Sequence, residues 1–193
     1  MPSSMIHLLT AHKVKTVPDA LFCIGTLAPD GVSDRAQKDR SHYRSHPDRM
    51  AALTALAGKT SPDDAFLEGA LLHLFTDWLW DEQSFVPYKA AHETVNPDWF
   101  LAYRKEISLA SIWIFHHSDW AMPAYERMLA VPLSCYGHPE GIPPEAARAY
   151  IERNFNFHAQ NNTAPSSVFT QEYVEGFTGA AAKEYIKWRN SVG

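Results

Sequence analysis

The segment from Ser61 to Glu82, SPDDAFLEGALLHLFTDWLWDE, constrains the fold more than any other part of the chain. Ser61 can cap a helix, Pro62 suits the first helical position, and the two aspartates that follow complement the helix dipole. Apolar residues then occupy nearly the whole circumference, as is typical of a helix at the centre of a domain. The sequence therefore predicts a central, largely buried helix.

Two side chains of the kind that bind metals, His73 and Asp77, lie four residues apart in this apolar segment. The spacing places the imidazole and the carboxylate one turn apart on one helix face. Burying both groups is costly unless something pairs with them. For this pair alone, two interpretations stay open: a metal site, or a hydrogen-bonded pair within a helical core.

The rest of the chain also predicts helices. We expect them at about residues 5–16, 18–28, 48–57, 98–117, 120–129, 145–160 and 170–190, with a long loop at 33–47 and a connection at 83–95. No stretch alternates at period two for long, and no hairpin signal occurs. A chain of 193 residues that is 46% hydrophobic can bury a sizeable core. We therefore predict a single all-α domain spanning residues 1–193, a helical bundle.

Composition narrows the possible functions. A formal net charge of −5 argues against general nucleic-acid binding, which usually needs a basic face. No apolar run approaches the roughly 18 residues of a transmembrane helix. The start, MPSSMIHLL, lacks the basic and apolar regions of a signal peptide, and the two cysteines form no ligand motif. We expect a soluble, cytoplasmic protein.

Other candidate ligands occur in distinct local contexts. His7 lies in the first predicted helix, His42 in the long polar loop, and Asp30 at an Ala-Pro-Asp-Gly helix end, where a plain turn aspartate is the alternative. The predicted helix ending near residue 117 finishes in His116-His117-Ser118-Asp119. These residues could bind a metal or an anion, or simply cap helix ends, and both readings stay open.

In order and context, five of these elements resemble the zinc-dependent phospholipase C family, and more distantly the zinc nucleases that cleave single strands. The matching pieces are IHLLTAHKV around His7, FCIGTLAPD ending in Asp30, SHY at His42, and FLEGALLHLFTD across His73 and Asp77. The resemblance covers roughly residues 1–83. The motif H-x-x-x-D is common by itself, whereas five elements in order are moderately specific.

The resemblance implies an all-helical bundle whose zinc ions cleave phosphodiester bonds by activating water. By position, Asp30, His42, His73 and Asp77 would form one zinc site. His7 would bind a second ion, with Asp77 bridging the two. Nitrogen and carboxylate ligands suit zinc, and paired ions can hold a phosphate and activate the attacking water.

The chain also departs from the family. The secreted phospholipases use an N-terminal tryptophan as a ligand, a histidine soon after the helix aspartate, and a later H-x-x-x-E pair. This chain begins MPSS, has WLWDEQ after Asp77, and shows no such pair. We therefore expect one or two ions, with His116, His117 or Asp119 as candidate replacement ligands. Asp81 is a candidate catalytic residue that orients water or acts as a general base, or else an ordinary helix-end carboxylate.

Three functional hypotheses follow. The leading one is a zinc-dependent hydrolase acting on a small-molecule phosphoester or phosphodiester, with Asp77 and Asp81 as catalytic residues. The second is a non-catalytic binding protein that retains a structural or vestigial metal, which a closed four-ligand site would favour. The third is a different hydrolysis, such as that of an amide, at the same metal site.

Overall fold

The computed structural model describes residues 2–137 and 141–192, and within these ranges the chain is helical and contains no strand. The all-α prediction is confirmed. The α-helices are α1 (Ser4–Val14), α2 (Ala20–Leu27), α3 (Arg35–Ser41), α4 (Arg49–Ala57), α5 (Ala65–Trp80), α6 (Val86–His92), α7 (Trp99–His117), α8 (Ala121–Ala130), α9 (Pro144–Gln160) and α10 (Gln171–Val192). Short non-α turns are η1 (Ala28–Gly31), the π-helical η2 (Asp81–Phe85) and η3 (Leu133–Cys135).

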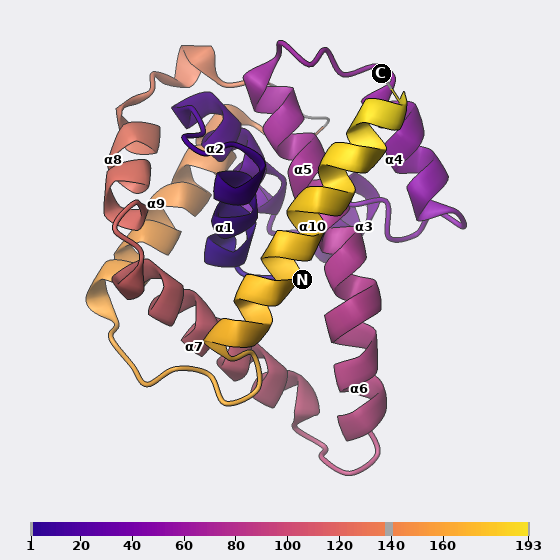
Figure 1. Ribbon diagram of the computed structural model, residues 1–193, viewed down its shortest axis with the longest axis vertical. Coiled ribbons are helices and arrows are strands. Elements are labelled where there is room, and N and C mark those ends of the chain that lie inside the picture. Colours follow the sequence, from indigo (N-terminus) through magenta and orange to yellow (C-terminus); the bar gives the residue numbers. More distant parts are fainter. Residues whose placement is uncertain (1, 138–140, 193) are drawn as a thin grey trace.

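Helix α5 lies at the centre of the fold, as its apolar sequence predicts. Almost every residue from Phe66 to Trp80 is buried, and α1, α2, α4 and α10 all contact it. Figure 1 shows α10 crossing in front of α1 and α5. The helix begins later than predicted, because Asp64 rather than Ser61 caps it by accepting the Leu67 N–H.

Two glycines allow α2 and α5 to pack unusually close together. A Cβ atom at Gly25 would lie 1.9 Å from Phe66 O, and one at Gly69 would lie 2.1 Å from Phe22 O. Only a residue without a side chain fits at either position, so the two backbones approach directly. This close crossing brings α2 against the first half of α5, where Thr26 O accepts from His73.

The prediction of one long loop at 33–47 is wrong, because α3 forms within it. Asp34 caps α3 by accepting the Gln37 N–H, and none of the helix's own residues is buried. A short charged helix with no apolar face carries no periodic signal that sequence reasoning can detect. After α3, Tyr43 adopts a left-handed φ of 54°, which turns the chain towards α4.

The predicted connection at 83–95 is also largely helical. The π-helical turn η2 continues α5 directly into α6, and the Val86 N–H donates to the Asp81 carbonyl five residues back. Pro87 follows at the start of α6, where its missing N–H and its ring disturb regular α-helical bonding. A π-turn absorbs that disturbance without breaking the helix.

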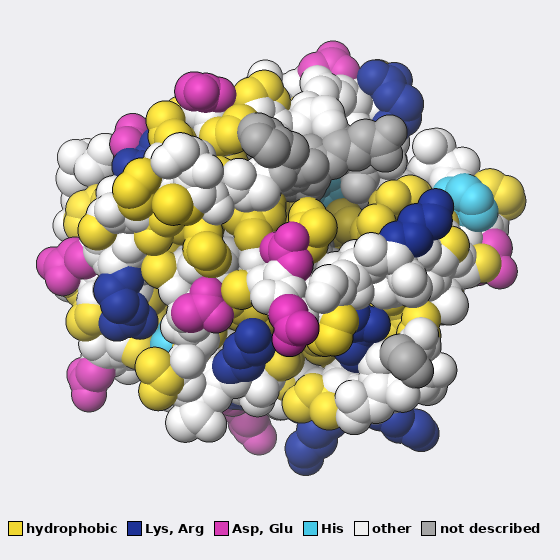
Figure 2. Space-filling view, turned by 90° about the horizontal axis from the view of Figure 1, so that it is seen from above, with side chains coloured by type: hydrophobic (Ala, Val, Ile, Leu, Met, Phe, Trp, Pro, Cys, Tyr) yellow, Lys and Arg dark blue, Asp and Glu magenta, His cyan; other side chains and the backbone are white. Residues whose placement is uncertain are grey.

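The remaining helices enclose the core. Helix α9 packs over η1, and α7, α8 and α9 contact one another on the side away from α4. On the face shown in Figure 2, acidic and basic side chains are interspersed among hydrophobic ones. None of the helices in the described ranges has the length and apolar character needed to traverse a bilayer.

Candidate metal centre

Five of the predicted ligands converge in the interior. His7 comes from α1, Asp30 from η1, His42 from the C-terminal cap of α3, and His73 and Asp77 from α5. The histidines and Asp77 have no exposed surface, and Asp30 is 6% exposed. Ligand atoms of His7, Asp30 and His73 lie within 4.8 Å of one another, and so do those of His42, His73 and Asp77. Both groups share His73.

Backbone carbonyls fix the tautomers of two histidines. His42 Nδ1 donates to Lys38 O and His73 Nδ1 donates to Thr26 O, each at 2.8 Å. A carbonyl can only accept, so each Nδ1 carries its proton and each neutral ring keeps a lone pair on Nε2. The two Nε2 atoms face each other at 3.1 Å. Two lone pairs this close need a proton or a cation between them.

The spacing around His42 is close to that of ligands that share one metal ion. With metal–ligand bonds of about 2.0–2.2 Å, neighbouring ligand atoms in a tetrahedron lie about 3.3–3.6 Å apart. His42 Nε2 lies 3.5 Å from Asp30 Oδ1 and 3.7 Å from Asp77 Oδ2, besides the 3.1 Å to His73. Nitrogen and carboxylate oxygen are ligands that zinc accepts. His42, His73 and Asp77 therefore fit a zinc ion in donor chemistry and lie close enough to share one, whereas Asp30 groups with His7 and His73.

Within residues 2–137 and 141–192, His7 is buried without a hydrogen bond on either ring nitrogen. Its ring stacks on that of His73, with centroids 3.9 Å apart, and its Nε2 lies 3.4 Å from Asp77 Oδ1. Asp77 Oδ1 also accepts no hydrogen bond. Buried polar atoms are normally paired, so a pair left without bonds at this position fits a second cation held between them.

Charge in the centre is arranged to keep the carboxylates ionised and His73 neutral. Burial alone raises the pKa of Asp30, but the neighbouring His42, His73 and Lys38 hold this pKa well below its usual value. Burial likewise opposes ionisation of Asp77, yet His7, the other histidines and Arg44 hold its pKa low. Burial lowers the pKa of His73 well below its usual value.

Two further residues support Asp30. Lys38 Nζ lies 2.5 Å from Asp30 Oδ1, and the Tyr150 hydroxyl donates to Asp30 Oδ2 at 3.1 Å. Burial and the neighbouring Asp30 raise the pKa of Tyr150 well above its usual value, so the phenol keeps its proton as a donor. Sequence reasoning missed both residues. Tyr150 is 120 positions from Asp30 and has no local signal.

A pair of arginines, also missed from the sequence, lies beside the ligands. Arg44 Nη2 donates to Asp77 Oδ2 at 3.0 Å, and Arg44 Nε donates to Asp81 Oδ2 at 3.1 Å. Arg49 Nη1 donates to the same Asp81 oxygen at 2.8 Å. Arg44 directly follows the SHY motif, and this position was the one sequence feature that could have identified it as a site residue. Asp81, a predicted catalytic residue, therefore contacts two guanidinium groups.

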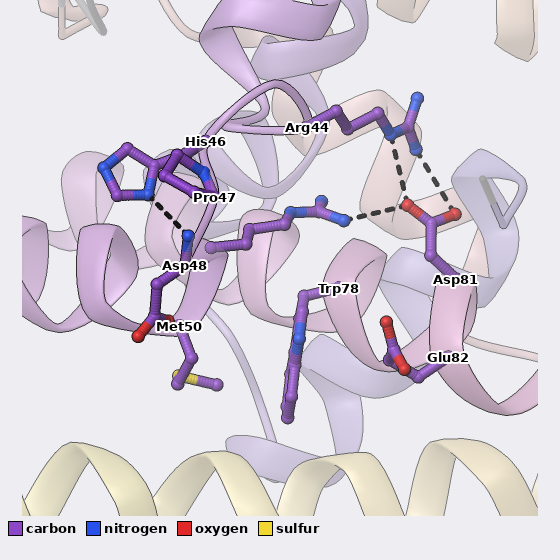
Figure 3. Close-up of a pocket in the computed structure, with 9 residues that line it drawn as sticks. Arg44, His46, Pro47, Asp48, Met50, Trp78, Asp81 and Glu82 are labelled. Atoms are coloured by element: carbon purple, nitrogen blue, oxygen red, sulfur yellow. Dashed lines mark hydrogen bonds and ion pairs between the residues drawn. The ribbon is translucent and has the colours of Figure 1, made fainter.

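These residues open onto a surface pocket of about 510 Å³. Its lining residues are Arg44, His46, Pro47, Asp48, Arg49, Met50, Trp78, Asp81 and Glu82. Figure 3 shows Arg44 reaching Asp81, and the Trp78 ring facing the same pocket as Met50. The pocket thus combines cationic donors on one side with apolar surface on another, next to the buried ligands.

The structure does not bring His116 and His117 to this centre. Both are exposed at the end of α7 and bond to backbone carbonyls: His116 Nε2 to His158 and Asn161, and His117 Nδ1 to Trp113. Neither belongs to the two ligand groups. Within the described residues, their position fits the helix-end reading of the HHSD segment.

Comparisons of the chain with protein-family models, with curated proteins and with solved structures found no match in any of the three. The likeness to zinc-dependent phospholipase C therefore rests on the sequence motifs alone. Function has to be argued from the geometry of the centre.

Proposed function

We propose that this chain is a metal-dependent hydrolase of a phosphoester, with zinc as the expected ion. The observation that carries the proposal is the pair of Nε2 lone pairs of His42 and His73, which face each other at 3.1 Å between two carboxylates. In a metal-free core this arrangement is repulsive unless a proton is shared between the two rings, whereas a divalent ion would contact both nitrogens and the carboxylates.

Bound there, zinc supplies Lewis-acid activation of water and of a phosphoester oxygen. The chain's own residues supply the rest. The carbonyls of Thr26 and Lys38 orient the two rings, and carboxylates that bind a metal are commonly held by such outer contacts. Arg44 holds the Asp77 carboxylate in this way, by donating from Nη2 to Asp77 Oδ2. Asp81 contacts both arginines, so we assign it as a positioning residue for the guanidinium groups rather than as the base.

The second candidate is a non-catalytic protein with a structural metal. One observation favours it: the five candidate ligands are almost completely buried, as in closed structural zinc sites. The pocket beside Asp81 and Arg44 favours the hydrolase, because substrate could reach the ligands from that side. Turnover separates the two candidates.

The test begins with elemental analysis of protein purified without a histidine tag or nickel column. We expect one to two equivalents of zinc in wild type, and loss of metal in His73→Ala. His158→Ala is the matched control, because His158 is equally buried but bonds to Ser111 and Asn154 outside the centre. Wild type that binds no metal even after supplementation would refute the proposal.

Activity is then measured on a panel of phosphoesters and amides with Asp77→Asn beside wild type. A hydrolase loses most of its turnover when this carboxylate becomes neutral, because Asp77 contacts both His42 and His7. Stoichiometric zinc with no turnover on any substrate would support the structural-metal candidate. Amide cleavage without phosphoester cleavage would support the third hypothesis.

A further inference from the structure

Arg49 is a mostly buried pocket residue whose guanidinium group is not fully hydrogen-bonded within the described residues. Its side chain is 11% exposed, and its Nη1 bonds to Asp81. Its Nε and Nη2 atoms are buried and have no hydrogen-bond partner among the residues that the structure describes. Guanidinium donors left unpaired in a buried position are costly, because the group keeps its charge at any ordinary pH. Such donors retain hydrogen-bonding capacity for a further anion, besides the ion pairs of Arg49 with Asp81 and Asp77.

The location of these donors places such an anion beside the candidate metal ligands. Arg49 Nη2 lies 4.0 Å from Asp77 Oδ2, and Arg44 Nη2 lies 3.0 Å from the same oxygen. Both arginines line the pocket. An oxyanion held by Arg49 would therefore contact both the pocket and the edge of the metal centre. Guanidinium groups match the oxygens of a phosphate particularly well.

The charges of the centre indicate which kind of phosphate fits. Lys38, Arg44 and Arg49 face three carboxylates, those of Asp30, Asp77 and Asp81. Within this group of six side chains the charges balance before a metal binds, so one divalent ion adds two positive charges to the group. A phosphomonoester carries about two negative charges near neutral pH, whereas a phosphodiester carries one. The monoester neutralises the loaded centre more completely.

The opposite wall of the pocket fits the organic part of such a substrate. Trp78 and Met50 line it beside the arginines, and the Trp78 ring faces the pocket in Figure 3. An indole face offers broad contact area for a ring. Asp48 and Glu82 are the exposed acidic members of the lining. They disfavour a substrate whose organic part carries further negative charge.

We infer that Arg49, together with Arg44, binds the phosphate dianion of a phosphomonoester whose ring-containing organic group packs on Trp78. The inference rests on the proposed hydrolase function, and it specifies the substrate class of that site. It also separates this chain from a phosphodiesterase, the activity that the family resemblance implies.

The first experiment measures binding of inorganic phosphate to zinc-loaded protein by titration calorimetry, without turnover. We expect Arg49→Gln to weaken binding at least about tenfold, as loss of a charge-assisted hydrogen bond predicts. Arg35→Gln is the matched control, because the Arg35 side chain is 88% exposed and pairs with Asp39, away from the pocket. It should leave binding unchanged. Zinc content should be the same in all three proteins.

A second measurement compares p-nitrophenyl phosphate with bis(p-nitrophenyl) phosphate. Wild type should show the higher kcat/KM on the monoester, and Arg49→Gln should lose more activity on the monoester than on the diester. Trp78→Leu should weaken binding of the aryl ester while leaving affinity for inorganic phosphate intact. If Arg49→Gln lowers the melting temperature greatly, Arg49→Lys keeps the charge and should bind phosphate with intermediate affinity.

Wild type that binds no phosphate, or Arg49→Gln that binds it as tightly as wild type, would overturn the inference. So would a preference of wild type for the diester. The proposed function fails separately, through absence of metal or of any turnover. The calorimetric titration is repeated on zinc-free wild type and Arg49→Gln, so it tests the role of Arg49 even then.

Discussion

Replacing Gly69 by alanine should destabilise the fold and the metal centre together. Alanine is normally the better residue inside a helix, by about 1 kcal/mol. At Gly69, however, the added Cβ would lie 2.1 Å from Phe22 O and 2.8 Å from Thr26 N. Ordinary contacts of this kind are 3.4–4 Å. Both clashing groups are backbone, so no side-chain rotation relieves them, and α2 has to move away by more than about 1 Å.

That movement has a cost that the structure allows us to estimate. Overpacking of a well-packed core costs about 1–3 kcal/mol. The displaced segment also carries Thr26 O, which accepts from His73 at 2.8 Å, and leaving a buried group unpaired costs about 1–3 kcal/mol. After the gain in helix propensity is subtracted, we expect a net loss of roughly 3 kcal/mol. For a chain of this length, that lowers the melting temperature by about 6–12 °C.

The assay is urea unfolding and thermal melting of metal-free protein, followed by zinc titration. Gly176→Ala is the matched control, because it is also a helix-interior glycine but has nothing within 4 Å of its added Cβ. It should stabilise the protein slightly. Gly69→Ala should bind zinc more weakly, since the His73 ring loses its orienting carbonyl. A Gly69→Ala protein as stable as wild type, with unchanged zinc affinity, would refute the reasoning.

Three further predictions test the centre and the core. His7→Phe should keep or raise the melting temperature of metal-free protein, because it removes buried nitrogens that make no hydrogen bond within the described residues. The same variant should show a smaller increase of melting temperature on addition of zinc. An increase as large as that of wild type would count against His7 as a ligand. Tyr150→Phe should weaken zinc binding about 10–100-fold in a chelator competition, because Asp30 loses its hydroxyl donor, and equal affinity would contradict this role. Burial lowers the pKa of His158 to about 4, so the unfolded chain takes up this proton at a higher pH than the native protein does. With chelator present, the free energy of unfolding should therefore fall as the pH drops from about 6.5 towards 4. The midpoint of urea unfolding should depend less on pH in His158→Gln than in wild type.

The helical parts of the fold that were predictable are those with a strong apolar pattern. Helix α5 could be placed at the centre because its apolar residues cover the whole circumference, and α7 because Asn96-Pro97-Asp98 marks its start. Helix α3 was not predicted because none of its residues is buried, so it has no apolar pattern. Helix α6 was not predicted because a proline such as Pro87 usually interrupts a helix. The π-turn that accommodates this proline depends on continuity with α5, which no local pattern shows.

The candidate ligands were predictable for a different reason. The order and local context of the motifs around them singled out five residues, and the structure brings these five together: His7, Asp30, His42, His73 and Asp77. Their outer partners were not predictable. Arg44, Arg49 and Tyr150 act through contacts across 30 to 120 residues of chain, and basic or aromatic side chains in polar segments are common.

The contacts that hold the two central histidines link the fold to the proposed chemistry. Thr26 lies in the last turn of α2 and Lys38 in the last turn of α3. His73 and His42 donate to these carbonyls, so each ring is oriented by a helix end, although Lys38 O also accepts the His42 backbone N–H. Helix C-terminal ends carry partial negative charge. Two such ends meet at the point where two lone pairs and two carboxylates already converge. A single proton between the rings would satisfy only the two lone pairs, whereas a divalent cation would contact the lone pairs and the carboxylate oxygens together.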